Sequence, residues 1–208
     1  GVGLVGSEMC IRDSLRNHLR SLTKSLLQLN LAILSGLAAF NLSAALIIVE
    51  PSENSYKDIQ EALIIAEPGD VVRLTGGTFV IKDGLSLDVP GVKIEGEGMD
   101  ASILEFSNQK SGAQGLLVTS DNVTLQDFAV VNAKGDAIKS KGADNISFIR
   151  VKTEWTGGPK TTNGAYGLYP VESENILIDD CVAIGASDAG IYVGPVSYTH
   201  LTLPTSRS

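Results

Sequence analysis

Short apolar segments separated by turns run through residues 46–194, and three of them follow one pattern. Each has an acidic residue, an asparagine, and then apolar residues at the first, third and sixth positions after the asparagine. The three segments are DNVTLQDF (121–128), DNISFIRV (144–151) and ENILIDDC (174–181). Alternation of apolar and polar side chains predicts β-strands with one buried face.

A second short strand precedes each of these segments, and a fourth begins at residue 189. Their apolar anchors, spaced 21, 30 and 23 residues apart, are Leu117, Ile138, Leu168 and Ile191. A repeat of about 22 residues indicates a solenoid, because a single coil of this size cannot bury its own apolar face. The longer interval indicates that one coil carries about eight extra residues as a loop.

A helix is predicted just before the first strands. Ile59, Leu63 and Ala66 share one helical face, and Pro68-Gly69 ends the helix. Strands are expected at 71–74 and 78–81, with a Gly-Gly turn between them. A helix that leads into short strands is typical of a cap at the end of a solenoid.

These features resemble the right-handed parallel β-helix proteins of the pectin-lyase-like superfamily over residues 56–194. The segment IQEALIIAEPGDVVRLTGGTF (59–79) is similar to their N-terminal capping helix and first coil, and SDAGIYVG (187–194) to a coil motif. The resemblance implies an all-β fold, a right-handed parallel β-helix with coils of about 22 residues and an N-terminal capping helix, truncated at its C-terminus. The superfamily includes lyases, hydrolases, epimerases and proteins without activity, so the fold leaves the chemistry open.

Three structural rows are expected along the coils. The asparagines at one corner resemble the asparagine ladders of such helices, with amides that satisfy turn backbone; they are Asn122, Asn145 and Asn175. A ladder of opposite charges is predicted at the next corner, formed by Asp127, Arg150 and Asp180. Cys181 should lie inward under Val151 as a small buried residue.

The outward side of the other strands carries the candidate binding residues. With the anchors inward, the outward residues are Val118, Lys139, Tyr169 and Tyr192, and Lys141 lies on the same face as Lys139. The resemblance implies that a glycan would lie across one such sheet. Tyrosine rings pack on sugars and lysines pair with uronate carboxylates, which predicts substrate binding by Lys139, Lys141, Tyr169 and Tyr192. The alternative is a solvated face with aromatic stacking between coils.

The extra residues of the long coil lie in EWTGGPKTTNGAY (154–166). This loop contains Trp155 and Lys160 and leads directly into the strand of Tyr169, so we expect it to overhang the same face and to contribute both residues to substrate binding. A loop without a function is the alternative.

Two aspartates open strands at the edge of this face and are the candidate acid–base groups together with Lys139. Asp136 and Asp188 should lie two coils apart, which is about 10 Å at the usual strand spacing. That separation suits an inverting pair of carboxylates better than a retaining pair. No cofactor and no metal site is expected, although the two aspartates could bind calcium. The alternative role for such residues is to cap turns.

Charge and histidine content restrict the chemistry further. Residues 46–194 hold 11 Lys and Arg against 22 Asp and Glu, a net charge of 11 − 22 = −11, which argues against nucleic acid as a partner. The two histidines, His18 and His200, both lie outside this segment. A histidine base or histidine metal ligand within residues 46–194 is therefore excluded.

Residues 15–45 have the pattern of an export signal. A basic start, with Arg16, Arg20 and Lys24, precedes the apolar stretch 26–40, and Ser43 and Ala45 occupy the small-residue positions before a cleavage site. An uncleaved membrane anchor and a helix of the protein's own core are the alternatives. The signal predicts a secreted or periplasmic protein that meets the membrane only through this segment. We also expect the protein to be a monomer.

Both ends of the chain resemble translated sequencing-adapter DNA. EMCIRDS (8–14) back-translates to GAG ATG TGT ATA AGA GAC AG, and VSYTHL (196–201) to GTC TCT TAT ACA CAT CT, which is its reverse complement over the shared stretch. We therefore expect residues 1–14 and 195–208 to be artefactual, with an incomplete β-helix domain at 46–194.

Two functions follow from these observations. The first is an exported β-helix that binds an acidic polysaccharide on an outward sheet face and cleaves or modifies it, as a polysaccharide lyase, epimerase or glycoside hydrolase. The second is a non-catalytic envelope or adhesion scaffold.

Overall fold

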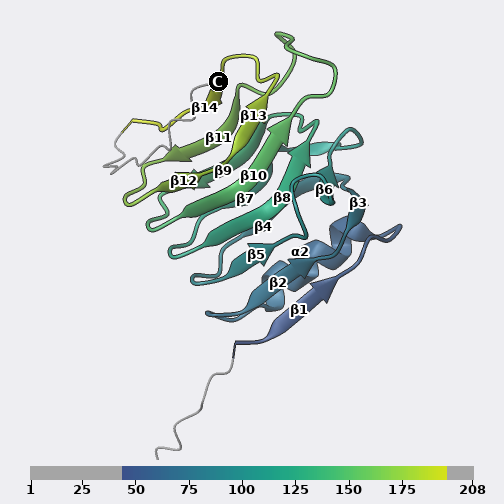
Figure 1. Ribbon diagram of the computed structural model, residues 1–208, viewed down its shortest axis with the longest axis vertical. Helices are drawn as coiled ribbons and strands as arrows, with labels where there is room; N and C mark the ends of the chain where they lie inside the picture. Colours follow the sequence, from purple (N-terminus) through teal and green to yellow (C-terminus); the bar gives the residue numbers. More distant parts are fainter. Residues whose placement is uncertain (1–43, 196–208) are drawn as a thin grey trace, which may run out of the picture. The chain divides into compact units, whose positions relative to one another are not determined.

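The computed structural model describes residues 44–195, which form one helix and fourteen strands (Figure 1). The expected N-terminal adapter segment lies outside the described residues, and of the expected export signal only residues 44 and 45 are described. Of the expected C-terminal adapter segment, only Pro195 is described. The elements are β1 (Leu46–Val49), α2 (Ser55–Ile65), β2 (Val71–Leu74), β3 (Gly77–Val80), β4 (Asp83–Leu87), β5 (Lys93–Glu95), β6 (Ser102–Glu105), β7 (Ser111–Val118), β8 (Thr124–Val131), β9 (Asp136–Lys141), β10 (Ser147–Glu154), β11 (Tyr166–Val171), β12 (Leu177–Asp179), β13 (Val182–Ile184) and β14 (Ala189–Ile191).

All described strand pairs are parallel, and the chain winds as a right-handed parallel β-helix. One series of strands has the order β1-β2-β5-β8-β10-β12, and a second has the order β14-β11-β9-β7-β4 (Figure 1). Apart from β1 and β2, which pair on either side of α2 in the sequence, no strand pairs with the next strand along the chain, so the pairs join successive coils. The predicted all-β solenoid is confirmed.

The long strands β8 and β10 are bent, so each of these coils presents three faces. Residues 124–126 pair with β5, whereas residues 129–131 pair with β6. The bends lie at Asp127 and Arg150, which have left-handed φ values of 59° and 49°. Such a backbone costs about 1–2 kcal/mol for a residue with a Cβ, and its recurrence in successive coils shows that the corner requires it.

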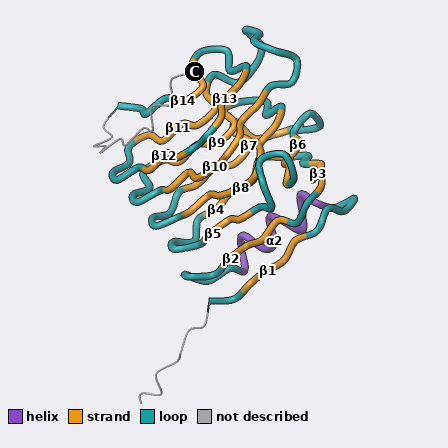
Figure 2. The backbone as a smooth tube through the Cα atoms, viewed as in Figure 1, coloured by secondary structure: helices purple, strands orange, loops and turns teal. Residues whose placement is uncertain are grey.

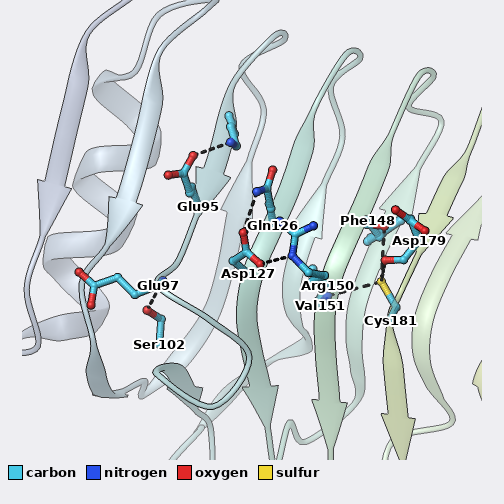
Figure 3. Close-up of polar contacts among 11 residues, drawn as sticks. Glu95, Glu97, Ser102, Gln126, Asp127, Phe148, Arg150, Val151, Asp179 and Cys181 are labelled. Carbon is cyan, nitrogen blue, oxygen red and sulfur yellow. Dashed lines mark hydrogen bonds and ion pairs between the residues drawn. The ribbon is translucent and has the colours of Figure 1, made fainter.

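The corner residues form part of the predicted charge ladder (Figure 3). Arg150 donates from Nε and from an Nη to the two carboxylate oxygens of Asp127, at 2.6 and 2.8 Å. These hydrogen bonds lower the pKa of Asp127 below its ordinary value. Asp180 has the same left-handed backbone at this corner, with φ of 50°, and acts on Arg150 through its charge.

The asparagine stack is confirmed, with different partners from those expected. Asn145 donates its amide to the side-chain oxygen of Asn122 at 3.0 Å, and Asn175 donates to Asn145 at 3.1 Å. All three residues have φ between 57° and 60°. The side-chain amides therefore pair with one another between coils rather than with the turn backbone.

The register of β7 differs by one residue from the prediction. Leu116, not Leu117, pairs with Ile138 and is buried, while Leu117 pairs with Lys139 and is half exposed. Val118, expected outside, is fully buried. Three consecutive apolar residues hide the alternation in this strand, and the corrected anchor makes the first interval 22 residues.

Helix α2 caps the end of the solenoid at which β1 and β2 lie (Figure 2). Its buried residues are Ser55, Ile59, Ala62 and Leu63, which confirms the predicted apolar face. Among the described residues, no helix has both the length and the apolar character needed to cross a membrane.

Cys181 packs against the core beside Val151 and Phe148 (Figure 3). The Val151 N–H donates to its Sγ at 3.5 Å, and the thiol donates to the Phe148 carbonyl at 3.4 Å. Burial raises the pKa of the thiol, so Cys181 is a poor nucleophile, in agreement with its predicted structural role.

Candidate functional site

The outer face of the sheet β14-β11-β9-β7-β4 carries the candidate site, and two strands of this sheet, β9 and β11, each bury two successive residues. Ala137 and Ile138 are both buried in β9, and Gly167 and Leu168 are both buried in β11. A Cβ on Gly167 would lie 2.4 Å from Thr153 Oγ1 and 2.4 Å from the Gly190 carbonyl oxygen. The first position of the pair must therefore be small, and the residue before it turns outward.

Asp136 and Tyr166 are the residues that this arrangement turns outward. Strict alternation from Ile138 and Leu168 would have placed both of them inside. Tyr166 is a site residue that the sequence analysis missed. The only feature of the sequence that indicates its outward position is the small residue between it and the anchor Leu168.

Three tyrosines, Tyr166, Tyr169 and Tyr192, form one cluster on this face, which we call the tyrosine cluster. The Tyr166 and Tyr192 rings stack with centroids 4.8 Å apart, and Tyr169 lies tilted at 4.5 Å from Tyr166 and 5.6 Å from Tyr192. Tyr192 is the most open, with 39% of its surface exposed. Because the rings cover one another, the cluster presents largely ring edges and hydroxyl groups.

Lys139 is held inside the same cluster. Its Nζ lies 4.5 Å from the centre of the Tyr169 ring and 3.9 Å from the Asp136 carboxylate. The side chains of Lys139 and Asp136 are only 20% and 15% exposed. The ammonium is therefore less free than an isolated surface lysine, and a ligand would contact it as part of a lysine–tyrosine–aspartate group.

The two aspartates lie on opposite sides of Tyr166. Asp136 opens β9 and accepts a hydrogen bond from the Tyr166 backbone, while Asp188 precedes β14 and accepts one from the Tyr166 hydroxyl. Strand β11 separates β9 from β14, so the expected separation of two coils is confirmed.

Burial and hydrogen bonding set the protonation of these groups. Burial raises the pKa of Asp136, against the opposing effect of Lys139. The hydrogen bond to Asp188 raises the pKa of Tyr166, and burial raises that of Tyr169. Both phenols therefore remain hydrogen-bond donors across the physiological pH range.

Lys141 supplies an open positive charge at the far end of β9. It pairs with Val171 across the sheet, and its side chain is exposed. We find no ion pair for it within residues 44–195. Lys141 therefore occupies the outward position that the sequence predicted.

Trp155 and Lys160 do not join the tyrosine cluster, which corrects the expectation for the long loop. Trp155 is 5% exposed, and its Nε1 donates to the buried Ala133 carbonyl at 2.7 Å. Lys160 is exposed and lines a separate hollow beside Asn132. The Trp155 side chain therefore belongs to the hydrophobic core and not to the outward face.

No metal centre is evident in the described part of the chain. Among residues 44–195, no three Asp, Glu, Cys or His side chains gather where they could hold an ion.

The buried carboxyl of Asp136 yields a prediction about pH. Its raised pKa means that the folded chain binds this proton more readily than the unfolded chain, so its ionised form reduces stability above the ordinary carboxyl pKa of about 4. Asp136→Asn keeps an acceptor for the Tyr166 N–H. We expect the variant to melt at a higher temperature than the wild type at pH 7, with the difference shrinking towards pH 4.

Thermal unfolding followed by circular dichroism at pH 7 and pH 4 measures this effect. Glu53→Gln, which removes an exposed carboxylate before α2, is measured alongside as the surface control. A lower melting temperature for Asp136→Asn at pH 7 would mean that attraction to Lys139 outweighs burial.

No protein-family profile and no curated protein sequence matches the chain. Among solved structures, two structures of pectin methylesterase in complex with hexasaccharides are similar, at 15% and 13% identity and with TM-scores of 0.45. Each match covers 68% of this chain, and it covers 49% of the first enzyme chain and 55% of the second. A pectin methylesterase from Erwinia chrysanthemi is similar at 12% identity and a TM-score of 0.44.

The chain thus spans about half the length of these enzymes. The likeness is confined to the fold.

Proposed function

We propose that the protein binds an acidic polysaccharide across the outer face of the sheet β14-β11-β9-β7-β4. The observation that carries this proposal is the gathering of Lys139, the tyrosine cluster and two aspartates on one face. Successive coils supply Lys139, Tyr169 and Tyr192, so an extended glycan lying along the solenoid axis would meet one of these side chains after another.

The chemistry of the face suits sugar hydroxyl groups and carboxylates. Phenol hydroxyls donate hydrogen bonds and aspartates accept them, which matches the alternating donors and acceptors of a glycan. Lys141 offers an open ammonium for a uronate carboxylate. Because residues 46–194 carry a net charge of −11, attraction for an acidic chain on this face depends on the local pair of lysines.

We further propose that the protein acts chemically on the bound glycan. Asp136 has a raised pKa, which is the property of a general acid. Asp188 is exposed. Lys139 contacts both the Asp136 carboxylate and the Tyr169 ring. These three are the groups to test for lyase, epimerase or hydrolase chemistry. The expected location is outside the cytoplasm, after export directed by residues 15–45.

A non-catalytic scaffold is the second candidate, and one observation favours it. The three tyrosine rings pack against one another, and this packing between coils would stabilise the solenoid without any ligand. On that view the aspartates cap turns and the lysines keep the face soluble.

Binding to a uronate polymer tests the first candidate. Lys141→Ala should raise the dissociation constant for polygalacturonate about two- to fivefold, the range for one exposed ion pair. The double variant Lys139→Ala/Lys141→Ala should bind more weakly still, because Asp136 then faces the ligand without its counter-charge. Isothermal titration calorimetry at low salt measures both constants.

Lys57→Ala, which removes an exposed lysine from α2 at the capped end, is the matched control and should bind as the wild type does. Catalysis is followed separately, by absorbance of unsaturated uronates and by new reducing ends, with and without calcium. Undiminished binding by the double variant would refute the assigned face, and the absence of any binding or product would leave the scaffold function.

A further inference from the structure

A polar hollow of about 330 Å³ lies where the long β10–β11 connection meets the turns after β6 and β8. The connection contributes Thr156, Lys160 and Thr162, and the two turns contribute Ser107 and Asn132. Trp155 closes its floor. No residue of the tyrosine cluster lines the hollow, so it is a separate feature of the surface.

Hydrogen bonds hold the walls of the hollow in place. The Asn163 amide donates to the carbonyl oxygens of Gly158 and Gly185, at 2.9 and 2.6 Å, which ties the connection to the next coil. The N–H and hydroxyl of Thr156 donate to the side-chain oxygen of Asn132, at 2.9 and 3.1 Å. With Trp155 anchored beneath, the backbone that carries Lys160 is preorganised.

The hollow favours a negative charge. Lys160 is the charged residue among those that line it, and it has no ion pair within residues 44–195. Glu105 does not line the hollow, and its carboxylate accepts hydrogen bonds from two residues that do, Ser107 at 2.6 Å and Asn132 at 3.2 Å. Lys160 therefore carries the charge of the lining, and its Nζ lies beside Gly157, another lining residue.

We infer that this hollow binds a single uronic acid unit, with Lys160 on the carboxylate and the hydroxyls of Thr156 and Thr162 on the sugar hydroxyls. A volume of about 330 Å³ is at the small end of ligand pockets, which suits one sugar rather than a chain. The choice of a sugar rests on the proposed function, whereas the preference for an anion rests on the lining residues.

Intrinsic fluorescence provides a direct test, because Trp155 is the single tryptophan in the sequence. The full chain is titrated with galacturonate, with galactose, which lacks the carboxylate, and with acetate, which lacks the sugar. We expect a saturable fluorescence change with galacturonate, none with galactose at equal concentration, and at least about tenfold weaker binding of acetate. An equal response to galactose, an equal affinity for acetate, or no response to galacturonate would each overturn the inference.

Matched variants assign the response to Lys160. Lys160→Ala should weaken galacturonate binding at least about tenfold, and Lys160→Arg should retain most of it. Lys134→Ala removes an exposed lysine from the neighbouring coil that does not line the hollow, and it should bind as the wild type does. Unchanged binding by Lys160→Ala would overturn the inference.

Each of the two proposals can be refuted without refuting the other. Polygalacturonate binding measured by calorimetry on the Lys139 and Lys141 variants concerns the sheet face. The tryptophan titration with the monosaccharide concerns the hollow, and it gives its result whether or not the polymer binds.

Discussion

Replacing Gly164 with alanine is expected to destabilise the protein by about 3 kcal/mol or more, at the upper end of what overpacking costs. A Cβ at this position would lie 1.8 Å from the Gly135 carbonyl oxygen and 2.8 Å from Cζ2 of Trp155. The first of these atoms is backbone in the coil below, and the second belongs to a buried ring. Neither can move without separating two coils, because the ladder hydrogen bonds keep the strands at a constant spacing.

Urea unfolding followed by circular dichroism measures the loss. Gly158→Ala is the control within the same connection, since nothing lies within 4 Å of its Cβ and only its φ of +73° opposes the substitution. That variant should lose about 1–2 kcal/mol. Equal losses for the two variants would show that backbone conformation, not the approach of Gly135, makes Gly164 necessary.

Truncating Trp155 to alanine is expected to destabilise the fold by about 3–5 kcal/mol, as for other large buried aromatic residues. The substitution leaves a cavity between coils and removes the donor of the hydrogen bond to the Ala133 carbonyl. Trp155→Phe keeps most of the packing and should lose about 1–3 kcal/mol, the cost of leaving a buried acceptor unpaired.

Polygalacturonate binding distinguishes this structural role from the one first expected for Trp155. Measured under conditions in which the variant remains folded, Trp155→Phe should bind the polymer as tightly as the wild type. A loss of polymer affinity without a loss of stability would return Trp155 to the binding face. The unfolding free energy and the dissociation constant are therefore determined on the same preparation.

Repetition explains why so much of the fold was predictable. The asparagines, the corner residues Asp127 and Arg150, and the strand anchors recur once per coil, so each prediction was checked several times within one sequence. Helix α2 was predictable for a related reason: its apolar face has a different period from the strands, and Pro68-Gly69 follows it. Interactions between successive coils depend on the repeat itself, and the repeat is visible without coordinates.

The candidate site was only partly predictable. Lys139, Tyr169 and Tyr192 were assigned to one outward face, and the structure brings them together. Tyr166 was missed and Leu117 was misplaced, because alternation fails where two neighbouring residues face the interior and where three apolar residues follow one another. Asp136 was assigned to the edge of the face, but its contacts with Lys139 and Tyr166 depend on those same irregularities.

By itself, the sequence determined the β-helix, its repeat length, its capping helix and the rows of side chains that stack from coil to coil. The tertiary structure alone decided which tyrosine completes the cluster, that Lys139 is shared between Asp136 and a ring, and that Trp155 lies in the core while Lys160 faces a separate hollow. The physical reason is that coil stacking repeats a local pattern, whereas an insertion such as residues 154–166 occurs once. The burial of Trp155 depends on contacts with the neighbouring coil, such as its hydrogen bond to Ala133, and no periodicity in the sequence predicts those contacts.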